Sequence, residues 1–253
     1  MTPILWHIEI SHYNEKARWA LDYKGIPHIR RTPLPGLHTL RVRMLTRGRY
    51  GRLPLLELEG RRIGDSTAII AALEAHQPEP SLYPAPGPDR ERALALEDHF
   101  DEHLGEFVRR FVFQHALSDL EATIDAVMPN AGAARKRLLR AGAMIVRPAI
   151  RRDYGVTQAG ADEALAAIRA AMDRLEQEIQ PSGYLVGESF TVADLTAAAL
   201  FTPLLAPPQR PHAPAPMPAP VQAVRDELEA RRGGAWVTEM YARHRPPSVA
   251  VRA

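Results

Sequence analysis

The sequence predicts an α/β region over roughly its first third, followed by a region built only from helices. Three observations support this fold class. Strand-like and helix-like segments alternate up to residue 77, five prolines among residues 77–88 then interrupt regular structure, and helical apolar spacing dominates beyond them. We therefore expect domains at 1–77 and 89–253, joined by a proline-rich linker at 78–88.

The first region reads as β-α-β followed by β-β-α. Gly25 suits the left-handed end of a helix, and Glu59-Gly60 suits the turn of a hairpin. The elements expected in order are a strand at 4–10, a helix at 15–24, a strand at 28–32, hairpin strands at 53–58 and 61–63, and a helix from Ser66.

Apolar residues beyond the linker repeat at spacings of three and four, which is typical of one buried helix face. One stripe is Leu96, Phe100, Leu104, Phe107 and Phe111, and a second is Leu165, Ile168, Met172, Leu175 and Ile179. Both stripes predict the core of a helical bundle rather than a ligand site. Residues 203–220 hold eight prolines, which predict a segment without regular secondary structure that crosses the surface. Two final helices are expected at 221–232 and 236–245.

The chain contains no cysteine, which excludes disulfides, cysteine-ligated metals and a thiol nucleophile of its own. The sequence offers no run of about 18 apolar residues to span a bilayer. Its first residues also lack the pattern of a signal peptide. We therefore expect a cytoplasmic protein with no membrane association and no metal cofactor.

Two stretches are basic and free of acids. Residues 23–56 carry eight lysines and arginines, and residues 131–152 carry seven. Such runs attract anionic ligands or nucleic acid, but they also occur as ordinary solvated surface. The second interpretation is favoured, so nucleic-acid binding is not expected.

The segment Ser11-His12-Tyr13-Asn14 lies where the first strand gives way to the first helix. A side chain there stands beside the positive end of the helix dipole, where free N–H groups favour an anion. Ser11 either faces an anionic ligand or merely caps the helix, and the segment alone does not decide between the two.

Two further segments are candidates for contacts with a ligand. Leu53-Pro54 stands at the entry of a strand, and a cis bond there would turn the Leu53 backbone outward, toward a peptide-like ligand. Asp65-Ser66 opens the last helix of the first region. The hydroxyl and first N–H groups there suit a carboxylate, whereas Asp65 suits an ammonium group. A plain N-cap pair is the alternative.

Together these segments resemble the N-terminal, thioredoxin-like domain of the glutathione transferase superfamily. The resemblance covers residues 3–77 and rests on KARWALDYKGIP, LPLLEL and GDSTAIIAALE. Residues 184–195 resemble the family's C-terminal domain, with Thr191 and Asp194 matching its buried capping box. The resemblance implies an α/β thioredoxin-like domain followed by an all-α helical-bundle domain, which is the glutathione transferase fold.

The resemblance also implies a glutathione site. Asp65 and Ser66 would hold the γ-glutamyl end, while Leu53, followed by Pro54, would pair with the cysteinyl backbone. Ser11 would face the sulfur, with Tyr13 as the alternative hydroxyl. For the glycyl carboxylate, the residues in plausible places are Arg52 and His38.

Because the chain has no thiol, the chemistry implied is activation of glutathione's own thiol. The leading hypothesis is a glutathione transferase that conjugates an electrophilic small molecule. A glutathione-dependent isomerase or dehalogenase would use the same thiolate. From a different class comes a non-catalytic assembly or regulatory protein of this fold. The family also implies a homodimer.

Overall fold

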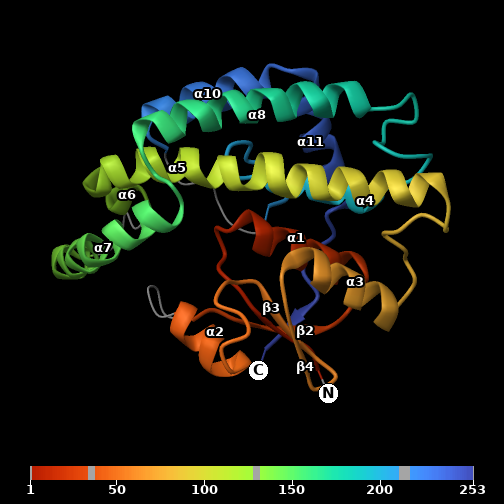
Figure 1. Ribbon diagram of the computed structural model, residues 1–253, viewed down its shortest axis with the longest axis horizontal. Coiled ribbons are helices and arrows are strands. Elements are labelled where there is room, and N and C mark those ends of the chain that lie inside the picture. Colours follow the sequence, from red (N-terminus) through yellow and green to blue (C-terminus); the bar gives the residue numbers. More distant parts are fainter. Residues whose placement is uncertain (1, 34–37, 128–131, 211–216, 253) are drawn as a thin grey trace.

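The computed structural model describes residues 2–33, 38–127, 132–210 and 217–252. The first elements are β1 (Ile4–Trp6), α1 (His12–Tyr23), β2 (His28–Arg31), α2 (His38–Thr46), β3 (Leu55–Leu58), β4 (Arg61–Gly64) and α3 (Ser66–His76). Those after the linker are α4 (Pro88–Phe100), the π-helix η1 (Asp101–Gly105), α5 (Glu106–Ser118), α6 (Leu120–Val127), α7 (Ala133–Asp153), α8 (Gln158–Glu178), α9 (Val192–Phe201), α10 (Ala219–Glu229), α11 (Arg232–His244) and β5 (Ala250–Val251). An α/β thioredoxin-like domain is therefore followed by a helical domain (Figure 1).

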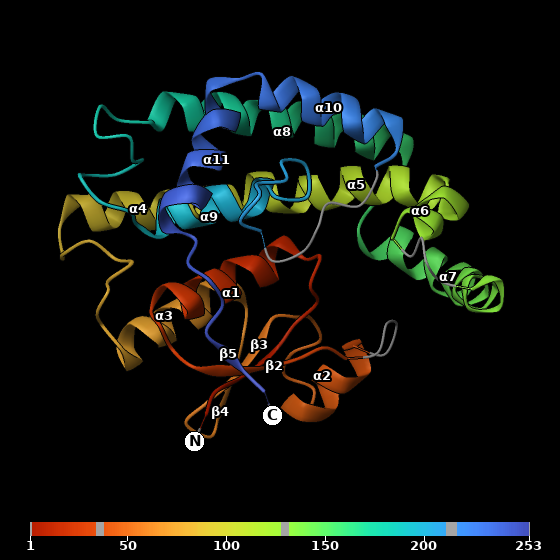
Figure 2. The same cartoon turned by 180° about the vertical axis from the view of Figure 1, so that it is seen from behind.

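The strands form one mixed sheet in the order β4-β3-β1-β2-β5. Because successive side chains on a strand point to opposite faces, the sheet has two apolar sides. Leu5 and Leu56 join α1 and α3 in the main core, while Trp6 and Leu55 pack with Val42 of α2 on the other side. Helices α1 and α3 thus lie between the sheet and the helical domain (Figures 1 and 2).

Helix α9 is buried along its whole length and packs against α1, α4 and α11. The capping box expected at its start is confirmed, since the Asp194 carboxylate accepts from the N–H of Thr191 at 2.8 Å. Helices α6 and α7 project from the rest of this domain (Figures 1 and 2). Within the described residues, no helix has the length and apolar character needed to cross a membrane.

Besides the bounds of individual elements, two features here differ from the sequence-based expectation, and part of one expected segment is not described. Helix α2 was not predicted, because only Val42 of its nine residues is buried and no apolar stripe marks it. The long helix expected over Leu96–Phe111 is interrupted by η1, so Val108, rather than Phe107, follows Leu104 in the core. Part of the expected crossing, residues 211–216, lies outside the described residues.

The end of the chain returns to the N-terminal sheet. Strand β5 pairs in parallel with β2, with Ala250 opposite His28. Just before it, buried Arg245 contacts the carboxylates of Glu15 at 2.7 Å and Asp22 at 2.9 Å. The expectation of helices alone over residues 89–253 therefore omitted a strand that belongs to the first sheet.

Candidate functional site

The three segments singled out in the sequence meet at one edge of the sheet. Trp6, the last residue of β1, pairs with Leu55, the first residue of β3. Leu55 also pairs with Gly64, the last residue of β4. The segments beginning at Ser11 and Asp65, and the Leu53-Pro54 pair, join the strands at this edge. The pairing register therefore brings together segments that are up to 54 residues apart in the sequence.

Ser11 is the N-cap residue of α1, but its side chain makes no capping hydrogen bond. Instead, Nδ2 of buried Asn14 donates to Ser11 Oγ at 2.7 Å. The other end of the same amide, Asn14 Oδ1, accepts from the N–H of Ile8 at 3.1 Å, which fixes the amide's orientation. Since the serine oxygen accepts from Asn14, its own proton is left to donate to a ligand.

Tyr13 faces the helical domain. Its phenol donates to the backbone carbonyl of Asp101 at 2.8 Å, and burial, followed by the nearby Asp101 carboxylate, raises its pKa above the ordinary value. Gly105 makes room for the ring, because a Cβ at that position would lie 2.4 Å from the phenol oxygen. The Tyr13 hydroxyl is therefore already engaged at the domain interface.

His12 is also buried at this interface. Its Nε2 lies 2.8 Å from the carbonyl oxygen of Gly105. Burial, followed by the charge of Arg109, lowers the pKa of His12 to about 3. The ring is thus neutral near pH 7, and its Nε2–H donates to Gly105.

Asp65 has a backbone conformation that is unusual for a side chain other than glycine, with φ at 75°. Its carboxylate Oδ1 caps α3 by accepting from the N–H groups of Thr67 at 2.9 Å and Ala68 at 3.2 Å. Two of the first amides of α3 are therefore occupied. A ligand carboxylate at this helix start would be left with the N–H and hydroxyl of Ser66.

A buried charge cluster ties the start of α3 to the helical domain. Lys16, which is fully buried, lies 2.8 Å from Glu97 and 2.6 Å from Asp101, and it also donates to the hydroxyl of Thr67. Thr67 in turn donates to Asp101 at 2.8 Å. Burial raises the pKa of Glu97 despite the neighbouring lysine. The cluster fixes the position of α3 relative to η1.

The remaining predicted residues differ in burial, from buried Pro54 to exposed Arg52. The Leu53-Pro54 bond is cis. Arg52 is exposed, with its guanidinium carbon 5.9 Å from the centre of the Tyr154 ring. His38, the first residue of α2, is half-buried, and burial lowers its pKa, which weakens it as a partner for a carboxylate.

Sequence reasoning missed Asn14 as a partner of Ser11, although the spacing of three residues on a helix could have indicated it. It also missed Asp101, Arg109 and Tyr154, which reach the first domain only through the tertiary fold. No group of three or more histidine, aspartate or glutamate side chains suited to a metal ion occurs within the described ranges.

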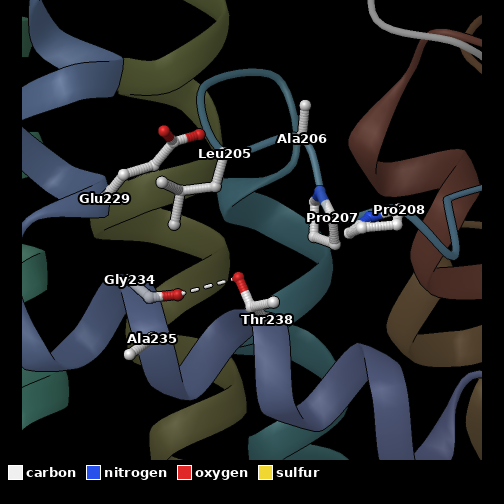
Figure 3. Close-up of a pocket in the computed structure, with 8 residues that line it drawn as sticks. All are labelled: Leu205, Ala206, Pro207, Pro208, Glu229, Gly234, Ala235 and Thr238. Carbon is white, nitrogen blue, oxygen red and sulfur yellow. Dashed lines mark hydrogen bonds between the residues drawn. The ribbon is translucent and has the colours of Figure 1, made fainter.

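A pocket of about 290 Å³ lies elsewhere, in the helical domain (Figure 3). It is lined by the segment after α9, the end of α10 and the first turns of α11, where Thr238 donates to the carbonyl of Gly234 at 3.2 Å. None of the residues predicted for the glutathione site lines it.

The fold and the sheet edge define a thioredoxin-like domain with an attached helical domain. Comparison with known proteins agrees with this class. The family model for the glutathione S-transferase N-terminal domain matches residues 5–81, and that for the C-terminal domain matches residues 158–234. The chain belongs to the glutathione transferase superfamily.

Solved structures of similar fold include three that cover nearly the whole chain. FzlA from C. crescentus has a TM-score of 0.59 at 20% identity, covering 100% of this chain and 97% of its own. The beta-etherase LigF from Sphingobium sp. strain SYK-6 has a TM-score of 0.61 at 21% identity, covering 94% of this chain and 99% of its own.

A glutathione S-transferase from Methylobacterium radiotolerans JCM 2831, in complex with glutathione sulfonate, has a TM-score of 0.55 at 20% identity, covering 97% of this chain and 95% of its own. At such identities these structures define the fold alone. No protein of curated function matches the sequence.

Proposed function

We propose that this protein is a glutathione transferase that activates the thiol of bound glutathione for attack on an electrophilic small molecule. The observation that carries the proposal is the Ser11 hydroxyl at the N-terminus of α1, whose oxygen accepts from Asn14 and whose proton has no acceptor among the described residues. Membership of the family and the arrangement of the sheet edge both support it.

The proposed binding of glutathione rests on groups that suit the charged ends of that molecule. At the start of α3, the N–H and hydroxyl of Ser66 suit the γ-glutamyl carboxylate, and the second oxygen of Asp65 suits the ammonium group beside it. The Leu53 backbone would pair with the cysteinyl unit, and Arg52 would attract the glycyl carboxylate. His38 is a weaker candidate for that role because burial favours its neutral form.

The chemical half requires a lowered thiol pKa. A free cysteine thiol has a pKa of about 8.5, so little thiolate exists at pH 7. A hydroxyl hydrogen bond to the thiolate contributes about 1.5–3 kcal/mol, and the helix terminus about 0.3–1 kcal/mol more. Together they would lower the pKa by about 1.5–3 units, enough for thiolate to predominate. Ser11 suits this role better than Tyr13, whose proton is engaged by Asp101.

Titration calorimetry with reduced glutathione tests the binding site. Asp65→Ala and Ser66→Ala should each weaken binding by about 1–3 kcal/mol, because a charged ligand group loses its partner. Thr157→Ala is the matched control: Thr157 caps α8 through the N–H of Gly160 just as Asp65 caps α3. The control should lose stability but keep its affinity for glutathione.

Conjugation of chlorodinitrobenzene tests the activity. Sulfur forms a bond to the ring carbon, and chloride leaves with the electron pair of the broken C–Cl bond.

If neither Asp65→Ala nor Ser66→Ala changed the affinity, the site assignment would be wrong. A protein that binds glutathione but conjugates no member of an electrophile panel would instead be the non-catalytic alternative. A homodimer remains an expectation that light scattering would check.

A further inference from the structure

Two arginines and two tyrosines meet across the domain interface beside the candidate site. The guanidinium carbon of Arg109, on α5, lies 4.3 Å from the centre of the Tyr154 ring and 5.7 Å from that of Tyr13. Arg52, from the first domain, approaches the same Tyr154 ring at 5.9 Å. Tyr13 belongs to the first turn of α1, which Ser11 begins, and Arg52 directly precedes Leu53, so the cluster includes residues from two of the segments that form the candidate site.

The positive charge of this cluster is poorly balanced. Arg109 contacts only the exposed Glu106, at 3.5 Å, among the carboxylates of the described residues, and no such carboxylate pairs with Arg52. Furthermore, Arg109 Nε is buried and has no hydrogen-bond partner in the part of the chain that the structure describes. The adjacent Arg110 differs, because it pairs with Glu163 at 3.1 Å and donates to the carbonyl of Tyr154. A buried donor without an acceptor is costly, and a bound anion would relieve that cost.

The stacking of Arg109 leaves its best donors available. Its guanidinium carbon stands over the Tyr154 ring, and its hydrogen bond to another side chain of the described residues is a long one, to Glu106 at 3.5 Å. The other N–H groups of the guanidinium can therefore donate to a ligand. Those donors match a carboxylate or sulfonate in bidentate geometry. The charge of Arg109 also extends toward the reacting end of α1, since it helps to lower the pKa of His12, the residue after Ser11.

We infer that Arg109 and Tyr154 form a subsite for an anionic group on the electrophilic substrate. The preferred substrates are then aromatic electrophiles that carry a carboxylate or sulfonate: the tyrosine rings contact the aromatic part, and Arg109 binds the acid. This inference rests on the proposed function, because it concerns the second substrate of the same reaction. Arg52 would bind the glycyl carboxylate of glutathione, and its positive charge would lie beside the anionic subsite.

A matched pair of acceptors tests the inference. 4-Chloro-3-nitrobenzoate and 4-chloro-3-nitrobenzamide differ in charge but share the leaving group, and each kcat/KM is divided by the rate of the uncatalysed reaction with glutathione. The wild type should favour the benzoate by about 10- to 100-fold, as expected for a charge-assisted pair. Arg109→Gln should abolish most of this preference, and Arg109→Lys should retain part of it. The control Arg169→Gln removes an exposed charge paired with Glu227 on the far helices, and it should leave the ratio unchanged.

Equilibrium binding keeps this inference separate from the proposed activity. Calorimetry would compare 3-nitrobenzoate with 3-nitrobenzamide, both with and without S-methylglutathione. If the protein conjugates neither acceptor, nor any member of the electrophile panel, but binds 3-nitrobenzoate in an Arg109-dependent manner, the proposed function fails and the anionic subsite stands. If the wild type conjugates both acceptors equally and binds both nitro compounds equally, the subsite is wrong and the proposed function stands. The wild-type measurements decide even if an Arg109 variant does not fold.

Discussion

Asn14 stands three residues after Ser11 on the first turn of α1, and this spacing lets its amide reach the serine hydroxyl. The segment Ser11-His12-Tyr13-Asn14 resembles a redox motif of related thioredoxin-fold proteins, with serine and asparagine at its two cysteine positions. Here a hydrogen bond of 2.7 Å joins the two positions instead. We regard Asn14 as a positioning residue, because it sets the direction in which Ser11 donates.

The Asn14→Asp substitution tests this direction with almost no change in shape. The introduced carboxylate cannot donate, so it would accept the Ser11 proton and turn it away from the thiol. The pKa of bound glutathione should rise by about 1–2 units, the equivalent of one charge-assisted hydrogen bond. Ultraviolet thiolate absorbance, measured as a function of pH with saturating glutathione, gives this value directly.

The added negative charge of the carboxylate must be separated from the lost hydrogen bond. The same Asn14→Asp change is therefore also made in a Ser11→Ala background. Most of the pKa rise should vanish there, because no hydroxyl remains to be redirected. An equal rise in both backgrounds would mean that charge alone acts and that Asn14 does not orient Ser11.

Much of the candidate site was visible in the sequence at the level of single residues. Ser11 was identified because it lies between the first strand and the first helix, and Asp65 because it opens a helix, and both are local properties. The spacing of Asn14 could have indicated a contact with Ser11, but the direction of the hydrogen bond depends on how the amide is oriented by Ile8. The pairing of Arg109 with Tyr154 joins residues 45 positions apart, and no local pattern signals it. The roles of the predicted residues in binding glutathione stay predictions.

At the scale of elements, the π-helix η1 is the main departure from the expected helix. An apolar stripe at spacings of four, four, three and four predicts one uninterrupted helix. The π turn shifts the register and places Asp101 and Gly105 where Tyr13 and His12 reach their carbonyl groups. Such turns occur frequently at functional sites. The periodicity in the sequence does not reveal the turn, because the side chains on both sides of it remain apolar.

Gly105→Ala should destabilise the protein and disturb the first turn of α1. The new Cβ would overlap the Tyr13 phenol, which lies 2.4 Å away, and overpacking of this kind costs about 1–3 kcal/mol. Urea unfolding gives the change in stability, and glutathione affinity reports on α1. Gly142→Ala in α7 is the control, because nothing lies within 4 Å of its Cβ position and alanine favours a helix. A Gly105→Ala variant as stable as the wild type would show that Tyr13 moves aside without cost.

At the scale of the whole molecule, two buried histidines should make folding sensitive to acid. Burial, followed by nearby arginines, lowers the pKa of both His7 and His12 to about 3. In the unfolded chain each would titrate near the ordinary value of 6.5. Between pH 6.5 and 3 the unfolded state therefore binds more protons, and stability falls as the pH falls.

Each histidine should contribute a slope of up to about 1.4 kcal/mol per pH unit within that window. His12→Gln removes one titrating group while keeping a side-chain N–H for the Gly105 carbonyl. The free energy of unfolding in urea, measured from pH 7 to pH 4.5, should then decline less steeply than in the wild type. An unchanged slope would contradict the buried, neutral state of His12.

The pairing of β5 with β2 also constrains when the first domain can complete its fold. A ribosome releases residues 4–76 early, and N-terminal domains generally fold first during synthesis. In this chain, however, the sheet lacks its fifth strand, and Glu15 and Asp22 lack the guanidinium of Arg245, until the segment 245–251 has emerged. The thioredoxin-like domain is translated first, but it reaches its final structure only after residues 245–251 have been released, so its folding is tied to that of the helical domain.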